Sequence, residues 1–198
     1  MAPEFTNSVL VSNGANCVIF DAWGRADDWT GMLDSRGLKP VAIYATHGHS
    51  DHISAAPALA AHYKIPWFMN ALDVPLILWG NGILDFWELP RIPDDFVRPN
   101  DLSAGRLNIL DNIDMDVIAA PGHSLGGLMF YFPEYKILLT GDTIFHDGVG
   151  RTDLPGGDEK TLRQSIANLM VRNLPDDTYV VHGHGADSMM RDIKAQFN

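Results

Sequence analysis

Short apolar runs alternate along the chain with segments of helical periodicity. Residues 8–12 and 15–21 predict two strands joined at Asn13-Gly14, a dipeptide suited to the positive-φ positions of a hairpin turn. The apolar run 41–46 predicts a buried strand, and the apolar spacing over 53–62 predicts an amphipathic helix. Further predicted strands lie at 66–69, 116–120, 128–132, 136–140 and 178–182, and further predicted helices at 72–79, at 159–171 with Asp158 as N-cap, and from about 187. The Pro- and aromatic-bearing segment 80–99 is hard to assign. The alternation of strands and helices along the chain predicts an α/β fold.

Histidine and aspartate side chains gather directly after several of these predicted strands. Four of them, His47, His49, Asp51 and His52, fall within six residues. We expect these four to converge from a loop, because neither a strand nor a helix would aim all four side chains to one point. Three more follow later strands: His123, Asp142 and His184. The seven side chains together are enough for a two-metal hydrolytic site.

The chemistry of these seven side chains follows from their ligand atoms. Neutral imidazole suits Zn²⁺, Fe²⁺ and related ions, and an aspartate between two ions can bridge them, a role for which Asp142 is the candidate. A bound dication lowers the pKa of water from about 15.7 to about 7, so water between two ions would be hydroxide. Such a nucleophile attacks carbonyl, thioester or phosphoryl centres. We therefore expect two divalent ions, zinc first and iron or manganese as alternatives.

The ordered motifs resemble a known family. The pattern His-x-His-x-Asp-His at 47–52, followed by His123, Asp142 and His184, resembles the signature of the metallo-β-lactamase fold superfamily. Thr-Gly-Asp-Thr-Ile-Phe at 140–145 and the segment 150–158 are similar to glyoxalase II-like (hydroxyacylglutathione hydrolase-like) hydrolases and their persulfide dioxygenase relatives. The resemblance implies a four-layer αβ/βα sandwich formed by one domain over 1–198. It also implies two ligand sets: His47, His49 and His123 for the first ion, and Asp51, His52 and His184 for the second.

The resemblance leaves three functional classes open. We favour a metal-dependent hydrolase that cleaves a small acyl or thioester substrate with a metal-bridging hydroxide, because the second ligand set is complete. In it Asp51 is the expected catalytic residue, holding the second ion or orienting the hydroxide. A mononuclear iron persulfide dioxygenase would, by the resemblance, use only His47, His123 and Asp142. The third class is a non-catalytic metal-binding domain. Glyoxalase II carries a C-terminal glutathione-binding helical domain, which we do not expect here because 14 residues follow His184.

Other histidines and serines near the motifs have plainer interpretations. His182 competes with His184 as the last ligand, but the glycines on both sides of His184 match the family's Gly-His-Gly turn and favour it. His62 and His146 are expected to be ordinary core or surface residues. The serines that follow ligand histidines, at positions 50 and 124, are expected to be hydrogen-bonding loop residues and not nucleophiles.

A few side chains outside the motifs bear on substrate binding. Arg151 and Asp153 are expected to form an ion pair that holds their loop, with a substrate clamp as the alternative. Trp79, Phe86 and Trp87 are expected in the core, with a substrate platform as the alternative.

Composition narrows the partners and the compartment. A net charge of −11 argues against nucleic acid or an anionic membrane as the main partner, because phosphates are bound by clustered Lys and Arg. The single cysteine, Cys17, excludes an internal disulfide framework and is expected to be a buried thiol. The start of the chain lacks the basic and apolar regions of a signal peptide, so a cytoplasmic protein is expected. Nothing in the sequence sets an oligomeric state.

Overall fold

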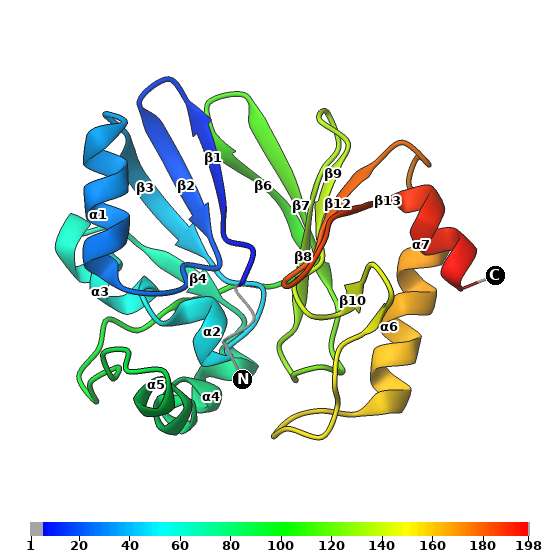
Figure 1. The fold of residues 1–198 in the computed structure, drawn as a ribbon. Coiled ribbons are helices and arrows are strands. Elements are labelled where there is room, and N and C mark those ends of the chain that lie inside the picture. Colours follow the sequence, from blue (N-terminus) through cyan, green and yellow to red (C-terminus); the bar gives the residue numbers. More distant parts are fainter. Residues whose placement is uncertain (1–5, 198) are drawn as a thin grey trace.

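Two β-sheets pack face to face, with helices on their outer faces, in the computed structural model, which describes residues 6–197 (Figure 1). The first sheet has the order β1-β2-β3-β4-β5, and only its first pair is antiparallel. Its strands are β1 (Val9–Asn13), β2 (Asn16–Phe20), β3 (Lys39–Tyr44), β4 (Trp67–Met69) and β5 (Asn100–Asp101). The helices of this half are α1 (Ala26–Ser35), α2 (Ser50–Ile53), α3 (Ala56–Tyr63), the 3₁₀ turn η1 (Ala71–Asp73), α4 (Val74–Trp79) and α5 (Asn81–Phe86).

The second sheet has the order β13-β12-β9-β8-β7-β6 and is mostly antiparallel. Its strands are β6 (Gly105–Leu110), β7 (Ile113–Ala119), β8 (Leu128–Phe132), β9 (Ile137–Leu139), β12 (Tyr179–Val181) and β13 (Ser188–Met189). A separate hairpin pairs β10 (Ile144–Phe145) with β11 (Gly148–Val149), and the outer helices are α6 (Glu159–Val171) and α7 (Met190–Gln196).

Three hydrophobic layers hold the four-layer sandwich together. Because side chains alternate along a strand, Cys17 and Ile19 of β2 face the layer under α1 and α3, while Val18 and Phe20 face the second sheet. Between the sheets, the Phe20 ring lies 5.2 Å from that of Phe130. The third layer packs the second sheet against α6 and α7. Strands buried on both faces read as continuous apolar runs, which is why they were predictable.

The predicted α/β sandwich is confirmed, and most predicted elements are present. The hairpin turns at Gly14 with a φ of 62°, Asp158 caps α6 by accepting a hydrogen bond from the Thr161 amide, and Cys17 is buried. No helix within 6–197 is long and apolar enough to cross a membrane.

Some local predictions were wrong. Only His47 and His49 lie in a loop, because Asp51 and His52 form the first turn of α2. The predicted helix over 53–62 is interrupted before α3 by a turn, and β13 intervenes before the last helix. The unassigned segment 80–99 contains α5.

Sequence analysis missed α1 and β6. In α1 the apolar residues Ala26, Trp29 and Leu33 follow a helical spacing and pack on the hydrophobic layer below the helix, so the signal was present and was overlooked. In β6 the exposed Arg106 and Asn108 interrupt the apolar run.

Candidate metal centre

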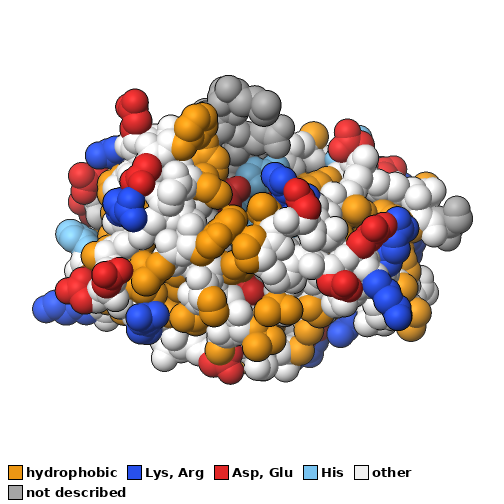
Figure 2. Space-filling view, turned by 90° about the horizontal axis from the view of Figure 1, so that it is seen from below, with side chains coloured by type: hydrophobic (Ala, Val, Ile, Leu, Met, Phe, Trp, Pro, Cys, Tyr) orange, Lys and Arg blue, Asp and Glu red, His pale blue; other side chains and the backbone are white. Residues whose placement is uncertain are grey.

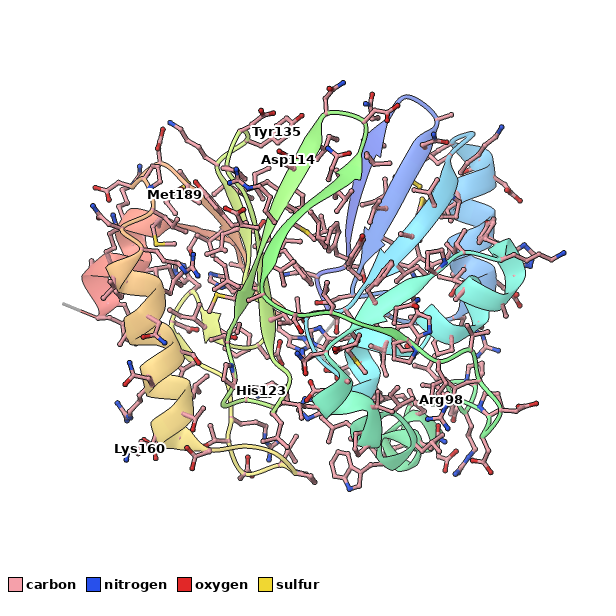
Figure 3. All side chains as sticks on the ribbon, turned by 180° about the vertical axis from the view of Figure 1, so that it is seen from behind. Arg98, Asp114, His123, Tyr135, Lys160 and Met189 are labelled. Carbon is pink, nitrogen blue, oxygen red and sulfur yellow. The ribbon has the colours of Figure 1, made fainter. Side chains whose placement is uncertain are left out.

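All seven side chains of the sequence motifs meet at one edge of the sandwich, where strands of both sheets end. His47 follows β3, His123 follows β7, Asp142 follows β9 and His184 follows β12. Figure 3 shows His123 at this edge, between the two halves of the molecule. The ligand atoms form three overlapping groups, each within 4.8 Å: His47, His49 and His123; His47, His52 and Asp142; and Asp51, His52 and His184.

Asp142 lies between the two ends of this cluster. Its Oδ1 is 3.2 Å from His52 Nε2, and its Oδ2 is 3.4 Å from His184 Nε2 and 3.6 Å from His123 Nε2. The carboxylate therefore reaches imidazoles of both predicted ligand sets, which is the placement that a bridging ligand requires.

A buried aspartate that sequence analysis missed, Asp21, orients two of the histidines. His52 Nδ1 donates to Asp21 Oδ2 at 2.9 Å, and the Thr46 hydroxyl donates to the same oxygen at 2.8 Å. The Thr46 hydroxyl in turn accepts from His47 Nδ1 at 3.0 Å. Both histidines thus donate their Nδ1 hydrogens to groups outside the cluster, which leaves Nε2 facing the cluster. Metal-binding histidines are commonly oriented by such outer hydrogen-bond partners.

The remaining donor atoms fit divalent cations. His123 Nδ1 donates to the Arg151 carbonyl at 2.8 Å, so its Nε2 faces inward, only 2.9 Å from His49 Nδ1. Two buried atoms of the cluster have no hydrogen-bond partner among the described residues, His47 Nε2 and Asp142 Oδ1. Buried polar atoms are rarely left unpaired, and imidazole nitrogens that face one another closely suit a cation between them.

The electrostatics divide the cluster into neutral imidazoles and charged groups. Burial and neighbouring imidazoles hold the pKa of His47 well below its usual value and lower the pKa of His49 to about 4. Burial also opposes charge on His184, but Asp142 and Asp51 outweigh it and raise the pKa of His184 to about 10. Burial likewise opposes charge on Asp142, yet the nearby His52 and His184 keep its pKa well below the usual range.

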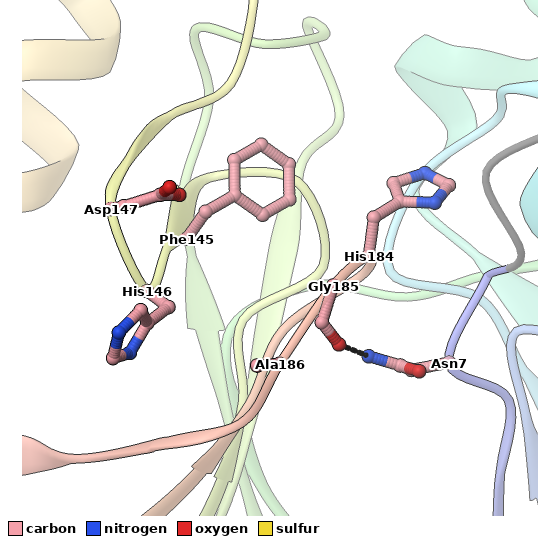
Figure 4. A pocket seen from close by; sticks show the side chains of 7 residues that line it. All are labelled: Asn7, Phe145, His146, Asp147, His184, Gly185 and Ala186. Carbon is pink, nitrogen blue, oxygen red and sulfur yellow. Dashed lines mark hydrogen bonds between the residues drawn. The ribbon is translucent and has the colours of Figure 1, made fainter.

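The other histidines lie outside the cluster. His182 is 1% exposed, donates from Nδ1 to the Ile144 carbonyl at 2.7 Å, and has its Nε2 2.8 Å from the Ser188 hydroxyl. It therefore holds β10 against the start of β13. His146 turns away from His184 on the β10–β11 hairpin (Figure 4), and His62 lies exposed on α3.

The residues that flank the cluster agree only in part with the sequence predictions. Arg151 and Asp153 form the expected ion pair, with two hydrogen bonds of 2.7 Å on an exposed surface. The prediction that the aromatic residues of 79–87 belong to the core was wrong for Trp79 and Phe86, which are 45% and 74% exposed. They lie on short surface helices, whereas Trp87 packs against the hydrophobic layer under α1 and α3.

The prediction that Ser50 and Ser124 are hydrogen-bonding residues is confirmed at one of the two positions. The Ser124 hydroxyl donates to Asp73 at 2.7 Å, whereas the buried Ser50 hydroxyl has no partner among the described residues, so that prediction was wrong. Asp73 is a second aspartate that sequence analysis missed. The sequence marks Asp73 only as a single acidic residue within an apolar helical stretch, and this pattern did not indicate what the carboxylate binds.

A cavity of about 550 Å³ opens beside the cluster (Figure 4). It lies on the His184 side, between the β10–β11 hairpin and the start of β1. Seen from below, histidine side chains reach the surface beside hydrophobic ones (Figure 2). The cavity is lined by Asn7, Phe145, His146, Asp147, His184, Gly185 and Ala186. The sandwich, the cluster and the cavity together define a class of protein: an αβ/βα metalloprotein with a candidate binuclear centre.

Comparison with known proteins identifies the family. The sequence profile of the Metallo-beta-lactamase superfamily matches residues 1–184. The chain is 32% identical over 192 residues to the probable metallo-hydrolase YqgX of Bacillus subtilis, covering 95% of this chain and 89% of that protein. It is 31% identical over 192 residues to the hydroxyacylglutathione hydrolase GloC of Haemophilus influenzae, covering 90% and 84%. The chain therefore belongs to the metallo-beta-lactamase superfamily.

A solved structure supports the same assignment. TTHA1623 in a di-iron-bound form superimposes with a TM-score of 0.85 at 32% identity, over 100% of this chain and 96% of that one. The general function that follows from family and site is that of a metallo-hydrolase acting on a small molecule.

Proposed function

We propose that this chain binds two divalent ions through the seven clustered side chains and hydrolyses a small acyl thioester. The observation that carries the proposal is the position of Asp142, whose two oxygens face imidazoles of both ligand sets. His47, His49 and His123 would hold one ion, and Asp51, His52 and His184 the other. Two ions held there would polarise a carbonyl and supply activated water.

The protein's own residues would arrange this chemistry. Asp21 and the Arg151 carbonyl fix the ring orientations of His52 and His123, so that the ligand nitrogens are preorganised. Asp51 Oδ2 lies 3.2 Å from His184 Nε2, and the Asp51 side chain is 22% exposed. We assign Asp51 the catalytic role of holding the second ion or orienting water, because it lies toward solvent where substrate would arrive.

The substrate class rests on similarity and on space. GloC, the hydroxyacylglutathione hydrolase, resembles this chain along most of its length, which supports a thioester. The cavity beside His184 supports a small acyl group. Zinc is the proposed metal, with iron and manganese as alternatives. The iron alternative is supported by TTHA1623, a similar protein whose structure was solved in a di-iron-bound form.

One contact favours the hydrolase over a one-iron persulfide dioxygenase. A dioxygenase site of His47, His123 and Asp142 would leave His49 outside the ligand set. Here His49 Nδ1 lies 2.9 Å from His123 Nε2 and belongs to the same group of ligand atoms. His49 is thus aimed at the position that an ion held by His123 would take.

The decisive experiment loads the protein separately with zinc, manganese and iron. Each form is then assayed on 2-hydroxyacyl-glutathione and other acyl thioesters, and oxygen uptake is recorded with glutathione persulfide. We expect two ions per chain and thioester cleavage without oxygen uptake. Oxygen uptake by the iron form, with no thioester cleavage under any metal, would establish the dioxygenase instead.

A further inference from the structure

Asp73 is a fully buried carboxylate outside every ligand motif. It ends η1 and precedes α4, and its exposed fraction is 0%. A buried carboxylate is costly unless it is hydrogen-bonded, so its partners show what holds it in place. An aspartate before a helix often caps that helix, but the Asp73 side chain makes no capping hydrogen bond to α4.

The donors to Asp73 come instead from two segments that carry metal-ligand candidates. The Gly48 amide donates to Oδ2 at 3.0 Å, the Ser124 hydroxyl donates to the same oxygen at 2.7 Å, and the Gly126 amide donates to Oδ1 at 2.7 Å. Gly48 lies between His47 and His49, and Ser124 follows His123. One carboxylate therefore joins the two loops whose histidines form a single ligand group.

The packing around Asp73 shows that this junction is tight. A Cβ atom at Gly48 would lie 2.7 Å from the Asp73 carbonyl oxygen, and one at Gly126 would lie 2.8 Å from Asp73 Cγ. Both distances are shorter than side chains tolerate, so only glycine lets each loop approach the carboxylate. The three hydrogen bonds, the two close glycine approaches and the burial of Asp73 all hold the two loops at a fixed separation.

We propose that Asp73 is a positioning residue that keeps the His47–His49 loop in register with the His123 loop, and so presets the site of the first ion. It is not itself a ligand, because both of its oxygens accept hydrogen bonds from the protein. The inference rests on the proposed metal centre and adds to it the residue that aligns its two loops.

The test compares Asp73→Asn with Asp101→Asn. Asp101 accepts a hydrogen bond from the Ala71 amide at 2.9 Å, so it braces the same turn, and among the described residues its side chain has no hydrogen bond to either ligand loop. Zinc affinity is measured by competition with a chromogenic chelator, and the ligand field by the absorption spectrum of bound Co²⁺. Thermal unfolding of the metal-free variants measures their structural cost separately.

We expect Asp73→Asn to weaken zinc binding about 10- to 100-fold and to change the Co²⁺ spectrum, whereas Asp101→Asn leaves both within about twofold of the native protein. Unchanged affinity and spectrum in Asp73→Asn would overturn the proposal, even if its metal-free stability fell. Equal losses in both variants would also overturn it, since they would indicate a general effect on the turn.

A second variant decides the matter if Asp73→Asn does not fold. Ser124→Ala removes one donor but keeps the carboxylate, and we expect a severalfold loss of zinc affinity; no loss would overturn the proposal. Native protein that binds no zinc or Co²⁺ would refute the metal centre itself, and with it this inference. Native protein that binds both metals but cleaves no thioester would refute only the proposed reaction.

Discussion

Replacing the two neighbouring histidines of the last motif, His182 and His184, should have different effects: one loss of stability and one loss of bound metal. His184→Ala removes an imidazole that contacts Asp51 and Asp142 at 3.2 and 3.4 Å, so it should cost metal. His182→Ala removes a buried ring whose two nitrogens meet the Ile144 carbonyl and the Ser188 hydroxyl. It should cost stability while the metal content stays normal.

The size of the stability loss follows from the two hydrogen bonds of His182. The Ser188 hydroxyl would be left without a partner, at about 1–3 kcal/mol, whereas the Ile144 carbonyl also accepts from the Thr140 hydroxyl at 3.0 Å and would lose only the net worth of one hydrogen bond, about 0.5–1.5 kcal/mol. His182→Ala should therefore lower the free energy of unfolding by about 1.5–4.5 kcal/mol. For a chain of this length, 1 kcal/mol corresponds to about 2–4 °C in Tm, which gives a fall of about 3–18 °C. His184→Ala should instead lose about half of the bound metal.

Elemental analysis and thermal unfolding of both variants, with the exposed His62→Ala as a control, measure these effects. Metal loss in His182→Ala comparable to that in His184→Ala would refute the reasoning, because His182 would then act at the cluster. Full metal content in His184→Ala would refute it equally.

Three further predictions concern catalysis, metal removal and pH. Asp51→Ala should lower kcat at least tenfold with little change in KM, because Asp51 acts on the transition state; steady-state kinetics with metal analysis measures this, and full kcat with both metals bound would contradict it. Chelation should lower Tm, and zinc at about 100 times Kd should restore about 2.7 kcal/mol per site, as calorimetry with and without zinc would record; an unchanged Tm argues against bound ions. Arg151→Ala should raise the pKa of Asp153 from about 2 toward its ordinary 3.8, followed by NMR titration. Because the folded-state pKa is the lower one, the stabilisation from this pair is present above pH about 4 and is lost as the pH falls toward 2; a pKa that stays near 2 in the variant would show another cause.

The sequence predicted the parts of this protein that depend on short stretches of chain. Strands such as β2, β3 and β8 are apolar runs, and all seven clustered side chains lie in compact motifs at strand ends. Asp73 was missed because its donors are 25, 51 and 53 residues away, and nothing local marks them as partners. Trp79 and Phe86 were placed wrongly because the local sequence around an aromatic residue on a short surface helix looks the same as the sequence around one in a core.

The cluster draws on distant parts of the chain, and this has a consequence for how the molecule holds together. His49 and His123 are 74 residues apart in sequence, and His52 and His184 are 132 apart. Ions bound there would close long loops, and closing a long loop removes more entropy from the unfolded chain than closing a short one. They would also fasten one sheet to the other. A backbone cut between the sheets, near residue 103, would then yield two fragments whose association strengthens with added metal and loosens with a chelator.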